Sequence, residues 1–138
     1  MYKMTQEIYN VLSANNNLKV FTEEKDGHST VWLQFRTKIG STYKIRFIST
    51  NDQNDVAVRV FSLVNVEEAS WPKLLPTINE LNREFRFVKF VLDQDGDVNI
   101  EYDFPLESNP TVCAEEILIR ILKIIDQAYP TLMRAIWQ

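Results

Sequence analysis

Three aspartates at alternate positions, Asp93, Asp95 and Asp97, are the residues of this sequence whose spacing comes closest to a metal site. Carboxylates at alternate positions begin the calcium-binding loop of an EF-hand. That loop also needs a glycine directly after its third ligand and a glutamate at its end, where this chain has Val98 and Phe104. The segment is therefore predicted to be a solvated turn, and no metal site is expected.

Catalysis would have to use His28, the single histidine, which lies in the turn-forming sequence KDGHST. General acid–base or nucleophilic chemistry needs a second group beside it, such as Ser29 or Cys113, and an orienting carboxylate. No local pattern provides this arrangement. The start of the last helix could favour a reactive thiolate at Cys113, but Glu115 and Glu116 oppose it, so Cys113 is expected to be a small packing residue. We predict that the protein is not an enzyme and has no cofactor.

Length and composition predict one ordinary globular domain covering residues 1–138, because 45% of the residues are hydrophobic and 25% are charged. The formal net charge of −4 opposes nucleic acid or an anionic membrane as the main partner. The single cysteine excludes an internal disulfide. No stretch approaches the roughly 18 apolar residues of a membrane span, and no secretion signal begins the chain. The expected location is the cytoplasm.

Residues 88–104 alternate between apolar and polar side chains, which predicts a β-hairpin. A two-residue turn would pair Phe90 with Glu101 and mix apolar and charged residues on one face. A three-residue loop at residues 94–96 pairs Phe90 with Ile100 instead, so this register is favoured. It also places a glycine where the loop needs a positive φ.

The first half of the chain predicts an antiparallel meander of four strands. Residues 30–37 and 42–48 pair best through another three-residue loop that ends in glycine, which sets Leu33 opposite Ile45. A strand at residues 18–24 precedes this hairpin. The alternating valines from Val56 to Val60 supply the inward face of the fourth strand.

Three helices complete the predicted order α-ββββ-α-ββ-α, an α+β fold with helices packed on an antiparallel sheet. The first helix ends near Asn15, and the second covers much of residues 67–84, with Ser70 as a candidate N-cap and Pro76 at its start or at a kink. Asn109 or Thr111 caps the last helix. Pro130 is expected to kink it or to restart it, which would make residues 131–138 a terminal turn.

Two surfaces are candidates for binding a partner. The predicted register gathers basic and aromatic residues on the second face of the meander, and the last helix has more apolar residues than one sheet face needs. Aromatic residues and arginine are enriched at protein interfaces, so a protein-binding surface is favoured. The alternatives are a single-stranded nucleic-acid platform, a merely solvated face, or plain core. The candidate residues are Trp32, Arg36, Lys44, Arg46, Arg59 and Phe61 on the sheet, and Met133, Ile136 and Trp137 on the helix.

Several short motifs resemble the bacterial YbjN-type domain. They are Leu81-Asn82, Phe90-Val91-Leu92-Asp93, Asp95-Gly96-Asp97-Val98, Tyr102-Asp103 with Pro105, and then Asp126, Tyr129-Pro130 and Leu132. The resemblance implies a fold similar to type III secretion chaperones. It also implies a non-enzymatic bacterial protein that regulates or holds other proteins, is often dimeric, and has no catalytic residues to assign.

The expected function is therefore a protein-binding module, chaperone-like or regulatory, whose partner is another protein or a second copy of the chain. A nucleic-acid-binding module that uses the basic and aromatic sheet face is the alternative.

Overall fold

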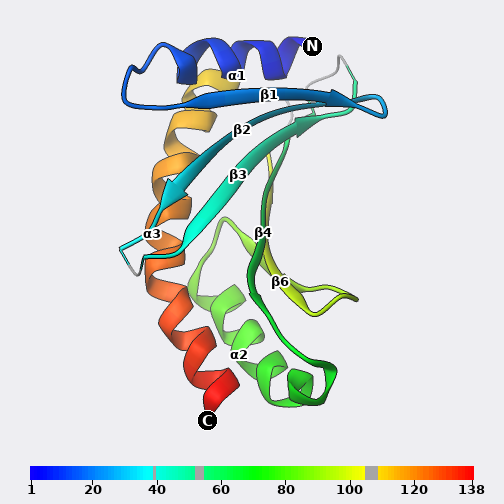
Figure 1. Cartoon of the computed structure of the whole chain (residues 1–138), viewed down its shortest axis with the longest axis vertical. Helices are drawn as coiled ribbons and strands as arrows, with labels where there is room; N and C mark the ends of the chain where they lie inside the picture. Colours follow the sequence, from blue (N-terminus) through cyan, green and yellow to red (C-terminus); the bar gives the residue numbers. More distant parts are fainter. Residues whose placement is uncertain (39, 52–54, 105–108) are drawn as a thin grey trace.

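An antiparallel sheet of six strands forms the centre of the computed structural model, which describes residues 1–38, 40–51, 55–104 and 109–138 (Figure 1). The strand order is β1-β2-β3-β4-β6-β5. The strands are β1 (Val20–Lys25), β2 (His28–Arg36), β3 (Thr42–Ser49), β4 (Ala57–Asn65), β5 (Lys89–Leu92) and β6 (Asp97–Asp103). The helices are α1 (Lys3–Ser13), the short 3₁₀ turn η1 (Glu68–Ser70), α2 (Trp71–Glu84) and α3 (Pro110–Trp137).

Strands β1 to β4 form the predicted meander, and the β5–β6 hairpin extends it. The hairpin attaches through β6, which pairs with β4 so that Val60 lies opposite Ile100. Helix α2 connects β4 to β5, and it therefore carries the chain past the position that β6 later fills. The predicted element order and the α+β fold are confirmed.

Both predicted hairpin registers are confirmed. Leu33 lies opposite Ile45, and Phe90 lies opposite Ile100. Gly40 and Gly96 end the two loops with φ values of +90° and +85°, which an L side chain rarely adopts. Turn chemistry and the alternation of apolar residues therefore specify the same pairing.

The helices pack on one face of the sheet and leave the other face open. Figure 1 shows α1 beside β1 at one end of the molecule, α2 at the other end, and α3 spanning the distance between them. Residues of β2 that face the helices, such as Val31 and Leu33, are buried, whereas Trp32 between them is only half-buried. Ile8 of α1 and Ile121 of α3 belong to the same core. The face without helices is called the open face below.

Helix α3 does not restart at Pro130, so the prediction of a separate terminal turn is wrong. The helix continues to Trp137 although proline removes one hydrogen bond and costs about 3 kcal/mol in a helix interior. Ala128 and Leu132, two residues before and after the proline, are both fully buried. Burial of the helix on both sides of Pro130 offsets the local cost.

The helix starts partly follow the predictions. The Asn109 side chain accepts hydrogen bonds from the N–H groups of Thr111 (3.0 Å) and Val112 (3.4 Å), so Asn109 is the cap of α3. Ser70 occupies the N-cap position of α2, but its side chain accepts no capping hydrogen bond. Pro76 lies inside α2, which runs through it.

Candidate protein-binding surface

One row of side chains on the open face crosses the whole sheet. Its members lie opposite one another in the pairing register, one from each strand in the order of the sheet. They are Phe21, Trp32, Arg46, Arg59, Glu101 and Lys89. The row is aromatic and basic over β1 to β3, and it alternates basic and acidic groups over β4 to β5.

Trp32 is held between neighbours on both sides. The Phe21 ring from β1 stacks on the indole with centroids 4.4 Å apart and 19° between the planes. The Lys44 ammonium from β3 lies 4.4 Å from the indole centroid. Because β1 and β3 flank β2, these contacts fix the ring in place, and the stacked pair forms a rigid apolar platform.

Two more cations accompany this platform. The Arg46 guanidinium lies 5.4 Å from the Phe61 ring centroid, and Arg36 is exposed at the end of β2. Within the described part of the chain, neither of these arginines nor Lys44 forms an ion pair with a carboxylate. We define the aromatic-basic patch as Phe21, Trp32, Arg36, Lys44, Arg46 and Phe61.

Arg59 shares the open face but differs from the other predicted cations, because two carboxylates neutralise it. Its Nη1 lies 2.8 Å from Asp103 Oδ1, and its Nη2 lies 3.8 Å from Glu101 Oε1. Lys89 also approaches Glu101, with 3.6 Å between Nζ and Oε1. The half of the open face over β4 to β5 is therefore a network of opposite charges.

The second predicted group lies elsewhere, at the C-terminal end of α3 (Figure 1). Ile136 is half-buried and packs against the core, and Met133 is half-buried. Trp137 is 77% exposed. The sheet residues and the helix residues thus form two separate surfaces, and Trp137 is the most exposed apolar side chain of the second.

Phe21 is the patch residue that the sequence analysis missed. Asp26 and Gly27 have φ values of +53° and +77°, which is the pattern of a two-residue type I′ turn. Such a turn sets Lys25 opposite His28 and, counting back, Phe21 opposite Trp32. The Asp-Gly pair in the sequence was a sufficient signal to predict this register.

The three alternate aspartates form the predicted turn, and internal hydrogen bonds occupy Asp93. Its carboxylate accepts from the backbone N–H groups of Asp95 (2.9 Å) and Asp97 (3.0 Å) and from Asn99 Nδ2 (3.0 Å). The Asn99 hydrogen bond is the main cause that lowers the pKa of Asp93 below its ordinary value. The Asp93 carboxylate therefore stabilises the hairpin turn.

The polar network continues into a β-bulge of β4. Asn99 Oδ1 accepts from the N–H of Ser62 (2.8 Å), a non-glycine residue with a φ of +57°. The register of β4 and β6 shifts between Val60 and Val64, on either side of Ser62. Asn99 is buried, and it satisfies the backbone where the two strands lose their regular pairing.

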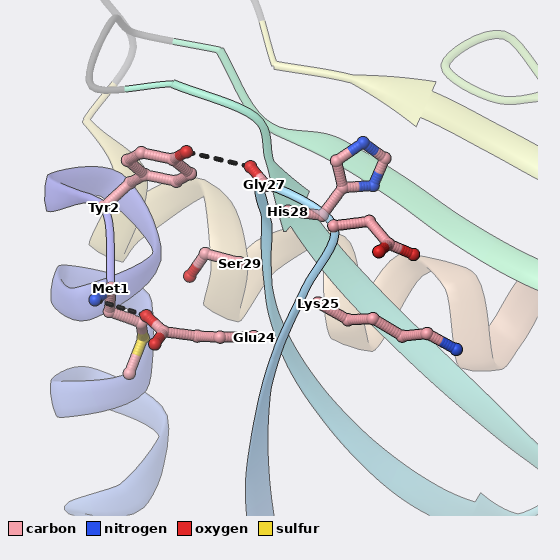
Figure 2. Close-up of a pocket in the computed structure, with 8 residues that line it drawn as sticks. Met1, Tyr2, Glu24, Lys25, Gly27, His28 and Ser29 are labelled. Carbon is pink, nitrogen blue, oxygen red and sulfur yellow. Dashed lines mark hydrogen bonds and ion pairs between the residues drawn. The ribbon is translucent and has the colours of Figure 1, made fainter.

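His28 lies beside a cavity of about 490 Å³ formed by the start of the chain and the β1–β2 turn (Figure 2). The Tyr2 hydroxyl donates to the Gly27 carbonyl (2.8 Å). Figure 2 shows the imidazole pointing away from Ser29, and the Ser29 hydroxyl is hydrogen-bonded to the Thr5 hydroxyl at 2.7 Å. The structure does not bring His28 and Ser29 together as a nucleophilic pair.

Cys113 packs in the first turns of α3, as expected for a small packing residue. It is half-buried and contacts the hydrophobic core.

In the portion of the chain with described coordinates, no helix has the combination of length and apolarity needed to cross a membrane.

These features define an α+β protein whose antiparallel sheet carries helices on one face and a row of aromatic and charged side chains on the other. The chain belongs to the YbjN family: the family model, described as "Putative bacterial sensory transduction regulator", matches residues 7–132. The match confirms the resemblance seen in the sequence motifs. No curated protein matches the chain.

Two of the motifs that carry the family resemblance, those containing Asn82 and Gly96, have structural roles. The Asn82 side chain holds the backbone of Phe90: its Nδ2 donates to the Phe90 carbonyl (3.1 Å), and its Oδ1 accepts from the Phe90 N–H (2.6 Å). A Cβ at Gly96 would overlap the carbonyl oxygen of Val66. These motifs therefore fix the β5–β6 hairpin on α2 and beside β4, and the aromatic-basic patch lies outside them.

Proposed function

We propose that this protein is a non-enzymatic regulatory module that binds another protein through the aromatic-basic patch. The observation that carries the proposal is the exposure of two phenylalanines on the same face as cations that have no carboxylate partner among the described residues. Phe21 is 41% exposed and Phe61 is 46% exposed. Aromatic side chains and arginine together are typical of the residues that dominate binding energy at protein interfaces.

The chemistry of the patch defines the chemistry of its partner. Apolar side chains of the partner would cover Phe21 and Phe61, and carboxylates would pair with Lys44 and Arg46, which lie between them in the sheet. Such charge-assisted pairs orient a partner and exclude basic surfaces. The expected partner is a protein surface that is apolar at its centre and acidic around it.

The contacts of the same residues support a nucleic-acid partner less well than a protein partner. Stacking of a base on Trp32 would compete with Phe21 and Lys44, which already lie against the indole. Arg59 is neutralised by Asp103 and Glu101, and the chain as a whole has a net charge of −4. These contacts favour a protein partner over a phosphate backbone.

Co-purification of the tagged protein from a lysate of its own source, at low and at moderate salt, tests the proposal. Bound protein and bound nucleic acid are quantified in the same sample. We expect a protein partner that resists moderate salt, is lost in Trp32→Ala and is retained in Lys89→Ala, a matched change on the other half of the open face. Circular dichroism confirms that both variants fold.

Two results would contradict the proposal. Nucleic acid that is recovered at low salt and released by modest salt would establish the alternative, because phosphate contacts weaken steeply with salt. A protein partner that Trp32→Ala retains in full would place the interface elsewhere.

A further inference from the structure

The two edge strands of the sheet, β1 and β5, differ in whether other elements bond to their outward-facing backbone groups. At the β5 edge, α2 lies against the strand, and Asn82 bonds both the N–H and the C=O of Phe90. The three-residue loop makes two pairs of the β5–β6 hairpin non-hydrogen-bonded, Leu92 with Val98 and Phe90 with Ile100. The backbone N–H and C=O groups of Leu92 and Phe90 therefore point away from β6. Asn82 therefore occupies the backbone positions that an additional strand would use.

At the β1 edge, no described residue bonds the outward-facing backbone groups in the way that Asn82 does at β5. Residues 21–25 are all exposed, and no described residue outside β2 forms a hydrogen bond with the β1 backbone. The two-residue turn makes Lys25 and His28 a hydrogen-bonded pair, and such pairs alternate along an antiparallel ladder. The N–H and C=O groups of Thr22 and Glu24 therefore point to the free edge.

We propose that the β1 edge accepts an extended segment of a partner protein as an additional antiparallel strand. This mode of binding takes its affinity from backbone hydrogen bonds and its specificity from alternate side chains. On the open face, the added strand would place an apolar residue beside Phe21, a basic residue beside Glu23 and an acidic residue beside Lys25. Read along the partner, the pattern is acidic, basic and apolar at alternate positions.

The side chains of β1 argue against a second copy of the chain at this edge. A twofold axis at Glu23 would set two glutamates directly opposite each other, and an axis at Thr22 would set Phe21 opposite Glu23. Like charges directly opposite are destabilising in a sheet. In these central registers, the edge therefore favours a strand of different sequence over a second copy of β1.

The strand proposal rests on the proposed function only in assigning this half of the sheet to a protein partner. The two can fail separately, because the edge is tested by a defined peptide and the aromatic-basic patch by a partner from lysate. The peptide has the core Glu-Thr-Lys-Thr-Ile, and its twin is N-methylated at the alternate amides that would bond to β1. The twin keeps every side chain and loses the backbone donors.

Titration of the isotope-labelled protein with each peptide, followed by amide NMR shifts, is the experiment. We expect the unmodified peptide to shift the amides of Thr22 and Glu24, and the methylated twin to bind at least about ten-fold more weakly. Thr22→Pro removes the edge-facing N–H but leaves the β1–β2 bonds, because proline is tolerated on an edge strand. It should weaken binding similarly, whereas Thr22→Ala, which keeps the N–H, should not.

Equal binding of the two peptides, or binding that Thr22→Pro leaves unchanged, would overturn the proposal, because contact would then depend on side chains alone. Absence of any shift up to the highest soluble concentration of the unmodified peptide would also overturn it. If Thr22→Pro fails to fold, the comparison of the two peptides on the unaltered protein decides the question by itself.

Discussion

The side-chain amide of Asn82, near the end of α2, forms hydrogen bonds with both backbone groups of Phe90 in β5, at 2.6 Å and 3.1 Å. Phe90 is buried, and it packs opposite Ile100 in the core. The pair ties the connecting helix to the hairpin that follows it. It gives a structural role to Asn82, one of the residues that carry the family resemblance.

Replacing Asn82 with alanine should lower the free energy of unfolding by about 1 to 2 kcal/mol, since two backbone groups of a buried residue lose their partners. Urea denaturation followed by circular dichroism measures the loss. Asn79→Ala, an exposed change one turn earlier on α2, is the control and should stay within about 0.5 kcal/mol of the unaltered protein. Equal stability of the two variants would show that the amide has no structural role.

Gly96→Ala should destabilise the protein far more than Gly27→Ala. Both residues have positive φ, which costs an alanine about 1 to 2 kcal/mol. The added methyl group at Gly96 would also overlap the Val66 carbonyl, whereas the space around Gly27 is open. The expected loss for Gly96→Ala is about 3 kcal/mol or more, measured by thermal and urea unfolding of both variants. Similar losses for the two would mean that the overlap relaxes without cost.

The hydrogen bonds at Asp93 predict acid sensitivity. Its pKa in the folded state lies below the ordinary value of 3.8, mainly because of Asn99. A lowered pKa adds stability that is fully present above the unfolded value and is lost as the pH falls through the folded value. Urea midpoints should therefore decline below about pH 4, and the decline should be shallower in Asp93→Asn, which has no carboxyl to protonate. An identical acid slope in the variant would remove Asp93 as a contributor.

Local patterns in the sequence predicted the two hairpin registers, because a one-residue slip would turn Leu33 or Phe90 toward water. The partner of β6 was not predictable in this way. Its pairing with β4 joins Val60 to Ile100 across the length of α2, and no turn residue specifies such a distant contact. The bulge at Ser62 has no local signal either, because a side chain far along the sequence, Asn99, stabilises its positive φ.

The prediction of each candidate site residue depended on predicting the pairing of the strand that carries it. Trp32, Lys44 and Arg46 follow directly from the β2–β3 register, and the structure places them together. The neutralisation of Arg59 by Asp103 could not be foreseen, because it depends on the β4–β6 pairing. Proline suggested a break in α3, but burial of Leu132 beyond Pro130 keeps the helix whole.

The Trp137→Ala variant tests whether the end of α3 is a partner surface or part of the packed core. Because the side chain is 77% exposed, the unfolding free energy should change by no more than about 0.5 kcal/mol. If this end of the helix contacts a second copy, as the sequence analysis allowed, sedimentation should show a smaller mass for the variant than for the unaltered protein. A large loss of stability would instead place Trp137 in the folded core.

The central claim is that a protein partner contacts the aromatic-basic patch, and site-specific photocrosslinking in cells of the source tests it most directly. A benzophenone amino acid replaces Phe61 on the open face or, as a control, Ile119, which is 56% exposed on α3. We predict a discrete protein adduct from position 61 that disappears when Arg46→Glu is added, and none from position 119. Adducts from position 119 alone, or only nucleic-acid adducts from position 61, would contradict the claim.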